Sequence, residues 1–515
     1  MDMKLKESNV WVADLRNGLY QNPILHADYS DPDVVQVGED FYMVASSFNM
    51  SPCLPVLHSK DLVNWKIINH VANELPYRHY DLPRHGEGVW APSLKYHAGK
   101  LWVFFATPDE GIFMSTAEDP AKEWSPLQLV KKAKGWIDTC PFWDDDGQAY
   151  LVSAFAKSRV GFKSILHLSK MKPDGTKLLD EGVHIFDGNL HHETIEGPKM
   201  YKRNGYYYIF APAGGVATGW QTILRSKNIY GPYEDKIVLH QGETNINGPH
   251  QGGWIETESG ESWFLHFQDK GAYGRIVHLQ PMSWKNDWPL MGHNQNEDGI
   301  GEPVISWRKP NVLAASDVMV PSTSDDFSKQ TLGLQWQWRA NVKQHWYSLE
   351  GQALRLFAIN QPKTVEKIYD TPHVLTQKFP AEVFSVTTEV TLQLDSNDDR
   401  CGLVVLGHDY AGISIKKVGP GLEVVYISGG LDKEETEVTV THVTDNHLYF
   451  RLEVKENARC IFSYSVDGEK FHSIDYSFTA TVGRWIGAQI GIFCLNNGNT
   501  VSSGYAEFTS FDVHL

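Results

Sequence analysis

The segment VGEDFYMVASS at residues 37–47 joins a glycine turn to an aromatic-rich run in which apolar and polar residues alternate. Four later segments repeat this combination: HAGKLWVFFA at 97–106, DDGQAYLVSAF at 145–155, RNGYYYIFAP at 203–212 and ESGESWFLHF at 258–267. A second strand-like run and a polar turn follow each copy. Short alternating runs bounded by Gly, Asp, Asn and Pro are typical of antiparallel strands.

The spacing of these copies predicts the architecture of residues 18–314. Five units of roughly 50 to 60 residues, each with four short strands, indicate a five-bladed β-propeller. The alternative is an irregular β-sandwich in which the similarity between the segments has no structural meaning. Few segments favour a helix, so the sequence predicts an all-β fold.

The composition of the sequence changes at residues 309–327, KPNVLAASDVMVPSTSDDF. This stretch is rich in Pro, Ser and Asp, which indicates a linker. Alternating segments such as FSVTTEVTLQL and GLEVVYI follow it. They predict a second domain over residues 324–515, a two-sheet β-sandwich of the concanavalin-like jelly-roll type. Its Trp336, Trp338 and Trp346 are expected in the core.

The amino-acid composition limits the classes of molecule that the protein is expected to bind. The 515 residues carry a net charge of −17, which disfavours nucleic acid and anionic membrane surfaces. Seventeen Trp and twenty-two Tyr suit stacking against sugar rings, although most aromatic residues serve the core. The five cysteines form no CxxC pair, and no stretch reaches the roughly 18 apolar residues of a membrane span. We expect a cytoplasmic location, or an extracytoplasmic one if a leader has been removed; the oligomeric state is not predicted.

Five residues share one position relative to the repeat glycines: Asp31, Trp90, Asp138, Glu196 and His250. The first strand of each propeller blade lines the central channel, so these side chains should converge at one end of the axis. Carboxylates brought together raise one another's pKa, which costs stability and serves acid–base chemistry. The alternative is that they only cap strands or turns.

The ordered motifs SDPDVV, GVWAPS, IDTCPFWDDDG, IEGPKMYKRNGYYY, NGPHQGGW and GRIVHLQPM resemble glycoside hydrolase family 43. Within it, they resemble the β-xylosidases and α-L-arabinofuranosidases that carry a C-terminal β-sandwich. The resemblance implies that Asp31 is the general base, Glu196 the general acid, and Asp138 the residue that modulates the pKa of the acid and orients it. It also implies inversion, for which the carboxyl groups of base and acid lie roughly 6.5–9.5 Å apart.

The same resemblance assigns the other candidate residues. Trp90 would wall the sugar pocket, and Arg275 would contact the sugar, with pairing to a channel carboxylate as the alternative or additional role. Phe48 would line the pocket or belong to the core. His250 would contact either a structural calcium ion or a water cluster on the propeller axis, and no cofactor is expected to be required.

These assignments predict an exo-acting, inverting glycosidase that releases terminal pentose, α-L-arabinofuranose or β-D-xylose, from hemicellulose-derived oligosaccharides or side chains. We favour α-L-arabinofuranosidase with xylan 1,4-β-xylosidase activity beside it. The alternatives are an endo-arabinanase, which would need an open cleft, and a propeller that binds glycans without cleaving them.

Overall fold

The computed structural model describes residues 10–312 and 317–515. Strands dominate both parts, and the described residues contain one short α-helix, α1 (Lys157–Val160). Short 3-10 helices lie in the connections: η1 (Arg78–Asp81), η2 (Gly271–Tyr273), η3 (Gln344–Trp346), η4 (Ile368–Asp370) and η5 (Glu456–Ala458). The predicted all-β class is confirmed.

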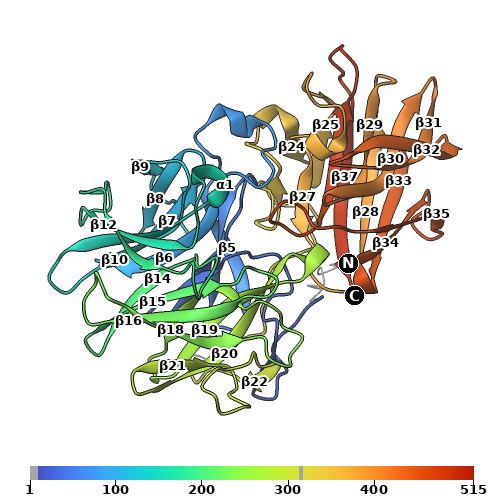
Figure 1. Cartoon of the computed structure of the whole chain (residues 1–515). Helices are drawn as coiled ribbons and strands as arrows, with labels where there is room; N and C mark the ends of the chain where they lie inside the picture. The colour runs from blue at the N-terminus through green and yellow to red at the C-terminus, as the bar shows by residue number, and fades with distance from the viewer. Residues whose placement is uncertain (1–9, 313–316) are drawn as a thin grey trace.

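The first part of the chain forms five four-stranded antiparallel sheets, as the repeat predicts (Figure 1). In each sheet the strands follow one another in chain order, so every blade is one continuous meander. The blades are β2 (Asp33–Val37), β3 (Asp40–Val44), β4 (Cys53–Ser59), β5 (Trp65–Ala72); β6 (Trp90–His97), β7 (Lys100–Thr107), β8 (Gly111–Ala117), β9 (Gln128–Lys132); β10 (Trp136–Trp143), β11 (Ala149–Phe155), β12 (Ile165–Met171), β13 (Val183–Asp187); β14 (Lys199–Arg203), β15 (Tyr206–Ala213), β16 (Trp220–Ser226), β17 (Glu234–His240); and β18 (His250–Glu256), β19 (Ser262–Asp269), β20 (Arg275–Lys285), β21 (Trp288–Met291).

Two pairings hold the ring closed where the chain enters and leaves it. Strand β1 (Leu19–Gln21) pairs with β22 (Ser306–Arg308), and Leu25 forms an antiparallel bridge with Val277 of the fifth blade. The segment that follows Leu25 therefore enters the first blade with its position set by the last. The predicted propeller end at residue 314 lies outside the described residues.

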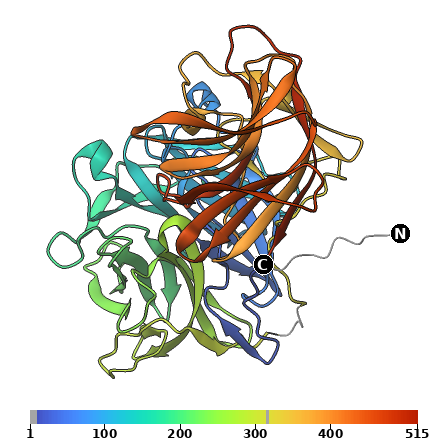
Figure 2. The ribbon, with the colours of Figure 1, turned by 90° about the vertical axis from the view of Figure 1, so that its right-hand side faces the viewer.

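The second part forms two packed sheets (Figure 2). One holds β23 (Gln337–Trp338), β26 (Ile359–Asn360), β27 (Leu375–Lys378), β29 (Asp399–Leu406), β30 (Asp409–Val418), β31 (Gly421–Gly430), β32 (Lys433–Val443) and β36 (Gln489–Asn496); the other holds β24 (Tyr347–Glu350), β25 (Ala353–Phe357), β28 (Phe384–Gln393), β33 (His447–Lys455), β34 (Arg459–Ser465), β35 (His472–Thr479) and β37 (Tyr505–His514). This is the predicted sandwich, and Trp336, Trp338 and Trp346 lie in its core.

The sandwich is fastened to the propeller by apolar packing and by backbone pairing. Its core cluster continues into the fifth blade through Tyr273 and Ile276. Ser51 and Trp338 exchange two backbone hydrogen bonds of 2.9 and 2.6 Å, and Asn341 donates its side-chain amide to the carbonyl of Leu75 at 2.9 Å. Because polar backbone groups are paired across the junction, the two domains are held in a defined orientation.

All five cysteines are buried and free. No helix among the described residues is both long enough and apolar enough to cross a bilayer.

Candidate active site

Irregular backbone in the innermost strands aims side chains into the channel. Strands β6, β10 and β18 each lose their register with the next strand near their first residues, at Ala91, Asp138 and Gln251. All three residues have positive φ, of 21°, 56° and 35°. A β-bulge adds one residue and re-aims a side chain, and backbone held in such conformations is concentrated at functional sites.

The side chains so aimed meet in one pocket. It is lined by Asp31, Phe48, Trp90, Ala91, Ile137, Asp138, Glu196, Val216, Gln251, Arg275 and Trp485. Six of the seven residues singled out in the sequence therefore lie together, and His250 contacts one of them from outside the lining. Sequence reasoning missed Trp485, because it belongs to the sandwich and has no counterpart in the blade repeat.

Asp31 sits among hydrogen-bond donors. Its Oδ2 accepts the hydroxyls of Ser30 and Ser46 at 2.7 and 2.6 Å, and Nη1 of Arg275 lies 3.2 Å from its Oδ1. The carboxyl is only 4% exposed. These contacts fix its orientation, and the guanidinium balances its charge. Arg275 thus pairs with a channel carboxylate, which is one of the two roles expected of it.

Asp138 lies beside the other two acids and is 3% exposed. Its Oδ2 accepts the backbone N–H of Gly197 at 2.8 Å and the side-chain amide of Gln251 at 3.2 Å. Burial raises the pKa of Asp138 well above 3.8, and the negative charges of Glu196 and Asp31 raise it further. Because Gly197 directly follows Glu196 in the chain, the bond to its N–H ties Asp138 to the backbone that carries the second acid.

Glu196 is the most open of the three acids, with 26% of its side chain exposed. Its Oε1 lies 2.9 Å from Nε2 of His250, which is fully buried. Nδ1 of His250 is buried without a hydrogen-bond partner, and the described residues contain no group of three or more His, Cys, Asp or Glu placed to hold a metal ion. Calcium takes six to eight oxygen ligands, and whether His250 faces a calcium ion or a water cluster stays a prediction.

Aromatic rings form the walls of this pocket. Trp90 and Trp485 approach with centroids 6.3 Å apart at 74°, and Trp90 donates its indole N–H to the carbonyl of Gly86 at 2.8 Å. Phe48 lines the pocket, yet it is only 3% exposed, so it serves the pocket and the core at once. Flat apolar faces beside hydrogen-bonding carboxylates suit a sugar ring.

The segment 482–487 brings Trp485 from the sandwich to the propeller. Gly487 donates its N–H to Oδ2 of Asp28 at 2.9 Å, and Ala488 donates to the carbonyl of Ala272 at 2.7 Å. On the opposite side, a Cβ on Gly86 would lie 2.3 Å from Cγ of Arg484. The segment is therefore seated between the second and fifth blades.

A propeller whose channel gathers three carboxyl groups, with aromatic walls and a second domain over the rim, defines a carbohydrate-cleaving hydrolase. The chain belongs to glycosyl hydrolases family 43, whose family model matches residues 20–289. A model described as the beta xylosidase C-terminal concanavalin A-like domain matches residues 324–514.

Individual relatives support this placement over most of the chain. A putative beta-xylosidase of Xylanibacter ruminicola is 40% identical over 93% of this chain and 87% of its own length. A non-reducing end alpha-L-arabinofuranosidase of Bacteroides ovatus is 30% identical over 78% of this chain and 76% of its own. A crystal structure of xylan beta-1,4-xylosidase from Bacillus halodurans shares the fold, with a TM-score of 0.84, 24% identity, and coverage of 96% of this chain and all of the other.

Proposed function

We propose that this glycosidase acts on chain ends, inverts the anomeric configuration, and releases single pentose units from hemicellulose-derived oligosaccharides. The observation that carries the proposal is the convergence of Asp31, Asp138 and Glu196 in one pocket whose wall includes Trp485 of the sandwich. A site enclosed by a second domain suits a terminal sugar better than the interior of a long chain, and so favours exo action over an endo-arabinanase.

In the proposed reaction Asp31 takes a proton from a water molecule, which attacks the anomeric carbon from the face opposite the leaving group. Glu196 gives its proton to the glycosidic oxygen as the bond breaks. After the water has lost one proton to Asp31, its remaining hydroxyl group becomes the new anomeric hydroxyl, with inverted configuration. The separation of roughly 6.5–9.5 Å between the two carboxyl groups that this requires stays a prediction.

Asp138 would serve as the modulator. Its buried carboxyl and its bond to Gly197 support a role in placing Glu196 and in setting the charge around it. Trp90, Phe48 and Arg275 would contact the sugar. Protons move only among carboxyl groups, water and the glycosidic oxygen in this scheme, so we propose that no cofactor is required.

The names of similar proteins support a proposal about which pentosides the enzyme cleaves. Beta-xylosidase and alpha-L-arabinofuranosidase are both names borne by proteins similar to this chain. The two pentosides present similar hydroxyl arrangements around the anomeric carbon, so one pocket can accept both. We propose that the enzyme cleaves α-L-arabinofuranosides and β-D-xylosides, and the relative rates remain to be measured.

Two measurements test the proposal. Release of nitrophenol from the two aryl pentosides, followed side by side, gives the preference. Proton NMR of the first product formed gives the anomer; an inverting enzyme yields β-L-arabinofuranose or α-D-xylose. Retained configuration would refute the mechanism, oligomeric products would favour endo action, and binding without any turnover would favour a non-catalytic glycan-binding propeller.

A further inference from the structure

A second cavity lies between the propeller and the sandwich, apart from the catalytic pocket. It is bounded by the first blade, the segment that leads into it, residues 319–323 and the end of β27, and it shares no lining residue with the catalytic pocket. Its volume is about 720 Å³, the opening to solvent included. Small-molecule sites occur preferentially at domain interfaces of this kind, where apolar side chains surround a few polar groups.

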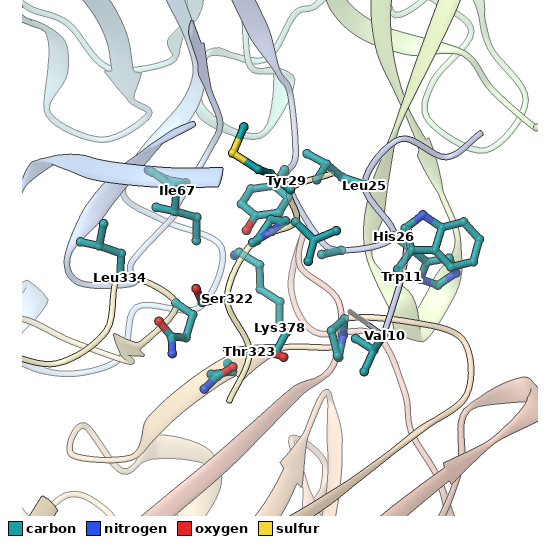
Figure 3. A pocket seen from close by; sticks show the side chains of 18 of the residues that line it. Val10, Trp11, Leu25, His26, Tyr29, Ile67, Ser322, Thr323, Leu334 and Lys378 are labelled. Atoms are coloured by element: carbon teal, nitrogen blue, oxygen red, sulfur yellow. The ribbon is translucent and has the colours of Figure 1, made fainter. Parts of the chain in front are cut away.

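A lysine ammonium stands in the middle of this cavity. Figure 3 shows the side chain of Lys378 crossing it with its nitrogen toward Tyr29. Nζ donates one hydrogen bond, to Oε1 of Gln337 at 3.3 Å, and lies 5.5 Å from the Tyr29 ring centroid. No carboxylate among the described residues forms an ion pair with it, and the charge of Asp28 acts on it only from a longer distance. An ammonium has three donor hydrogens, so the cavity leaves this cation short of acceptors.

Two further polar side chains of the lining lack partners. Nε2 of Gln377 is buried without a hydrogen-bond partner in a residue only 5% exposed. Both ring nitrogens of His26 are likewise unpartnered, in a side chain 2% exposed. Buried polar groups are nearly always satisfied, and exceptions of this kind call for an explanation such as a missing ligand. Donors outnumber acceptors, so the missing group should carry oxygen acceptors.

Most of the remaining lining is apolar, and this apolar surface favours a hydrocarbon body for the ligand. Ile24, Leu25, Val63, Ile67 and Leu334 face the cavity. An inorganic anion or a free sugar would leave these side chains against polar surface, whereas a hydrocarbon ring or branched chain would bury them. The cation and the amide together then favour a carboxylate at one end of that body.

We propose that this interdomain cavity binds a small organic monocarboxylate, with its carboxylate on Lys378 and Gln377 and its apolar body against the side chains of the first blade. The site is independent of the glycosidase reaction. Its occupant would bridge the propeller and the sandwich, because Ile67 belongs to β5 and Lys378 to β27.

Isothermal titration calorimetry on the full chain, with benzoate as the probe, tests the proposal. One benzoate should bind per chain. Benzamide, which has the same ring without the charge, should bind roughly ten- to a hundredfold more weakly, which is the range of one charge-assisted hydrogen bond in a desolvated site.

Variants locate the binding. Lys378→Met keeps most of the length of the side chain and removes the cation, so it should weaken the binding of benzoate by the same roughly ten- to a hundredfold. Lys433→Met, which removes an exposed cation paired with Asp409, is the matched control and should leave the affinity unchanged. Ile67→Trp should fill the cavity and abolish binding while Lys378 stays in place. Circular dichroism and thermal unfolding show whether each variant is folded.

The proposal is overturned if benzoate does not bind the wild-type chain, or if folded Lys378→Met binds it as tightly as the wild type does. Equal affinity for benzoate and benzamide would also overturn it. Because the readout is binding and not turnover, these results are separable from any failure of the proposed glycosidase function.

Discussion

At the residue scale, Asp138 is held where its ionised form is disfavoured. The pKa of its carboxyl is raised above 3.8 by burial and by the charges of Glu196 and Asp31. Between pH 3.8 and that raised pKa, the folded chain holds a proton that the unfolded chain has lost. Stability therefore falls as pH rises through this window.

Asp138→Asn removes this penalty, because an amide keeps the shape and an acceptor oxygen for Gly197 without a charge. The variant should unfold at a higher temperature than the wild type at pH 7, because it has no carboxyl group whose ionised form is disfavoured by burial and by neighbouring charges. The difference in unfolding temperature between the variant and the wild type should narrow as pH falls toward 4. The substitution should also lower kcat. Thermal unfolding at both pH values measures it; a wild type more stable than the variant at pH 7 would contradict this account.

Substrates with different leaving groups can distinguish the role of Glu196 from the role of Asp31. Glu196→Ala should lower kcat/KM on xylobiose by roughly 10²- to 10⁴-fold and much less on an activated nitrophenyl pentoside, because only the poor leaving group needs a proton. Asp31→Ala is the comparison, since a water must be activated for either substrate and both should suffer alike. Steady-state kinetics on the two substrates decides, and equal losses in Glu196→Ala would remove it from the role of acid.

The convergence of the three carboxyls was predictable because they recur at one position of a repeat, and a propeller brings such positions together. Trp485 was not, since nothing in the sequence of a sandwich loop reveals which rim it will cover. The ion pair of Arg275 with Asp31 was open for a related reason. Spacing places Asp31 near the channel and the family resemblance places Arg275 there, but neither gives the geometry between their atoms.

At the scale of elements, the bulges in β6, β10 and β18 could not be read from alternation, because a single inserted residue leaves the pattern of apolar residues almost intact. The long edge strand β32 gives only a weak signal in the sequence. Its residues are mostly exposed, so it lacks the apolar face by which the other sandwich strands are recognised.

Asp28 is the junction of three segments. Besides Gly487, its carboxylate accepts the backbone N–H of Arg275 at 2.9 Å, and a Cβ on Gly274 would lie 2.5 Å from its Cγ. The buried side chain of Asp28 thus holds both the start of β20 and the segment that carries Trp485. Asp28 itself lies three residues before the proposed base, Asp31.

Asp28→Ala should leave two buried N–H groups without acceptors and destabilise the chain by about 2–5 kcal/mol. Urea unfolding measures the loss. Asp119→Ala is the control: that carboxylate pairs with Lys122 at the surface, so no measurable change in stability is expected. A loss in Asp28→Ala no larger than the control's would show that the junction does not hold these segments.

At the scale of the whole molecule, the catalytic pocket belongs to both domains. Ten of its eleven lining residues come from the propeller, and the eleventh, Trp485, comes from the sandwich. Its ring lies across from Trp90, and the Arg275 guanidinium is 5.7 Å from its centroid. The sandwich is thus expected to take part in substrate binding, beyond any role in stability.

Trp485→Ala tests this directly, because it opens one wall and leaves the three carboxyls untouched. Burying an aromatic face against a sugar contributes about 1.5–3 kcal/mol, so kcat/KM should fall roughly ten- to a hundredfold, mainly through KM. Trp485→Phe should restore most of the loss, which separates the lost ring from any disturbance of the segment. Products of xylo-oligosaccharide digestion, followed by chromatography, should then include oligomers if this wall enforces exo action. Unchanged KM in a folded Trp485→Ala variant would place the sandwich outside substrate binding.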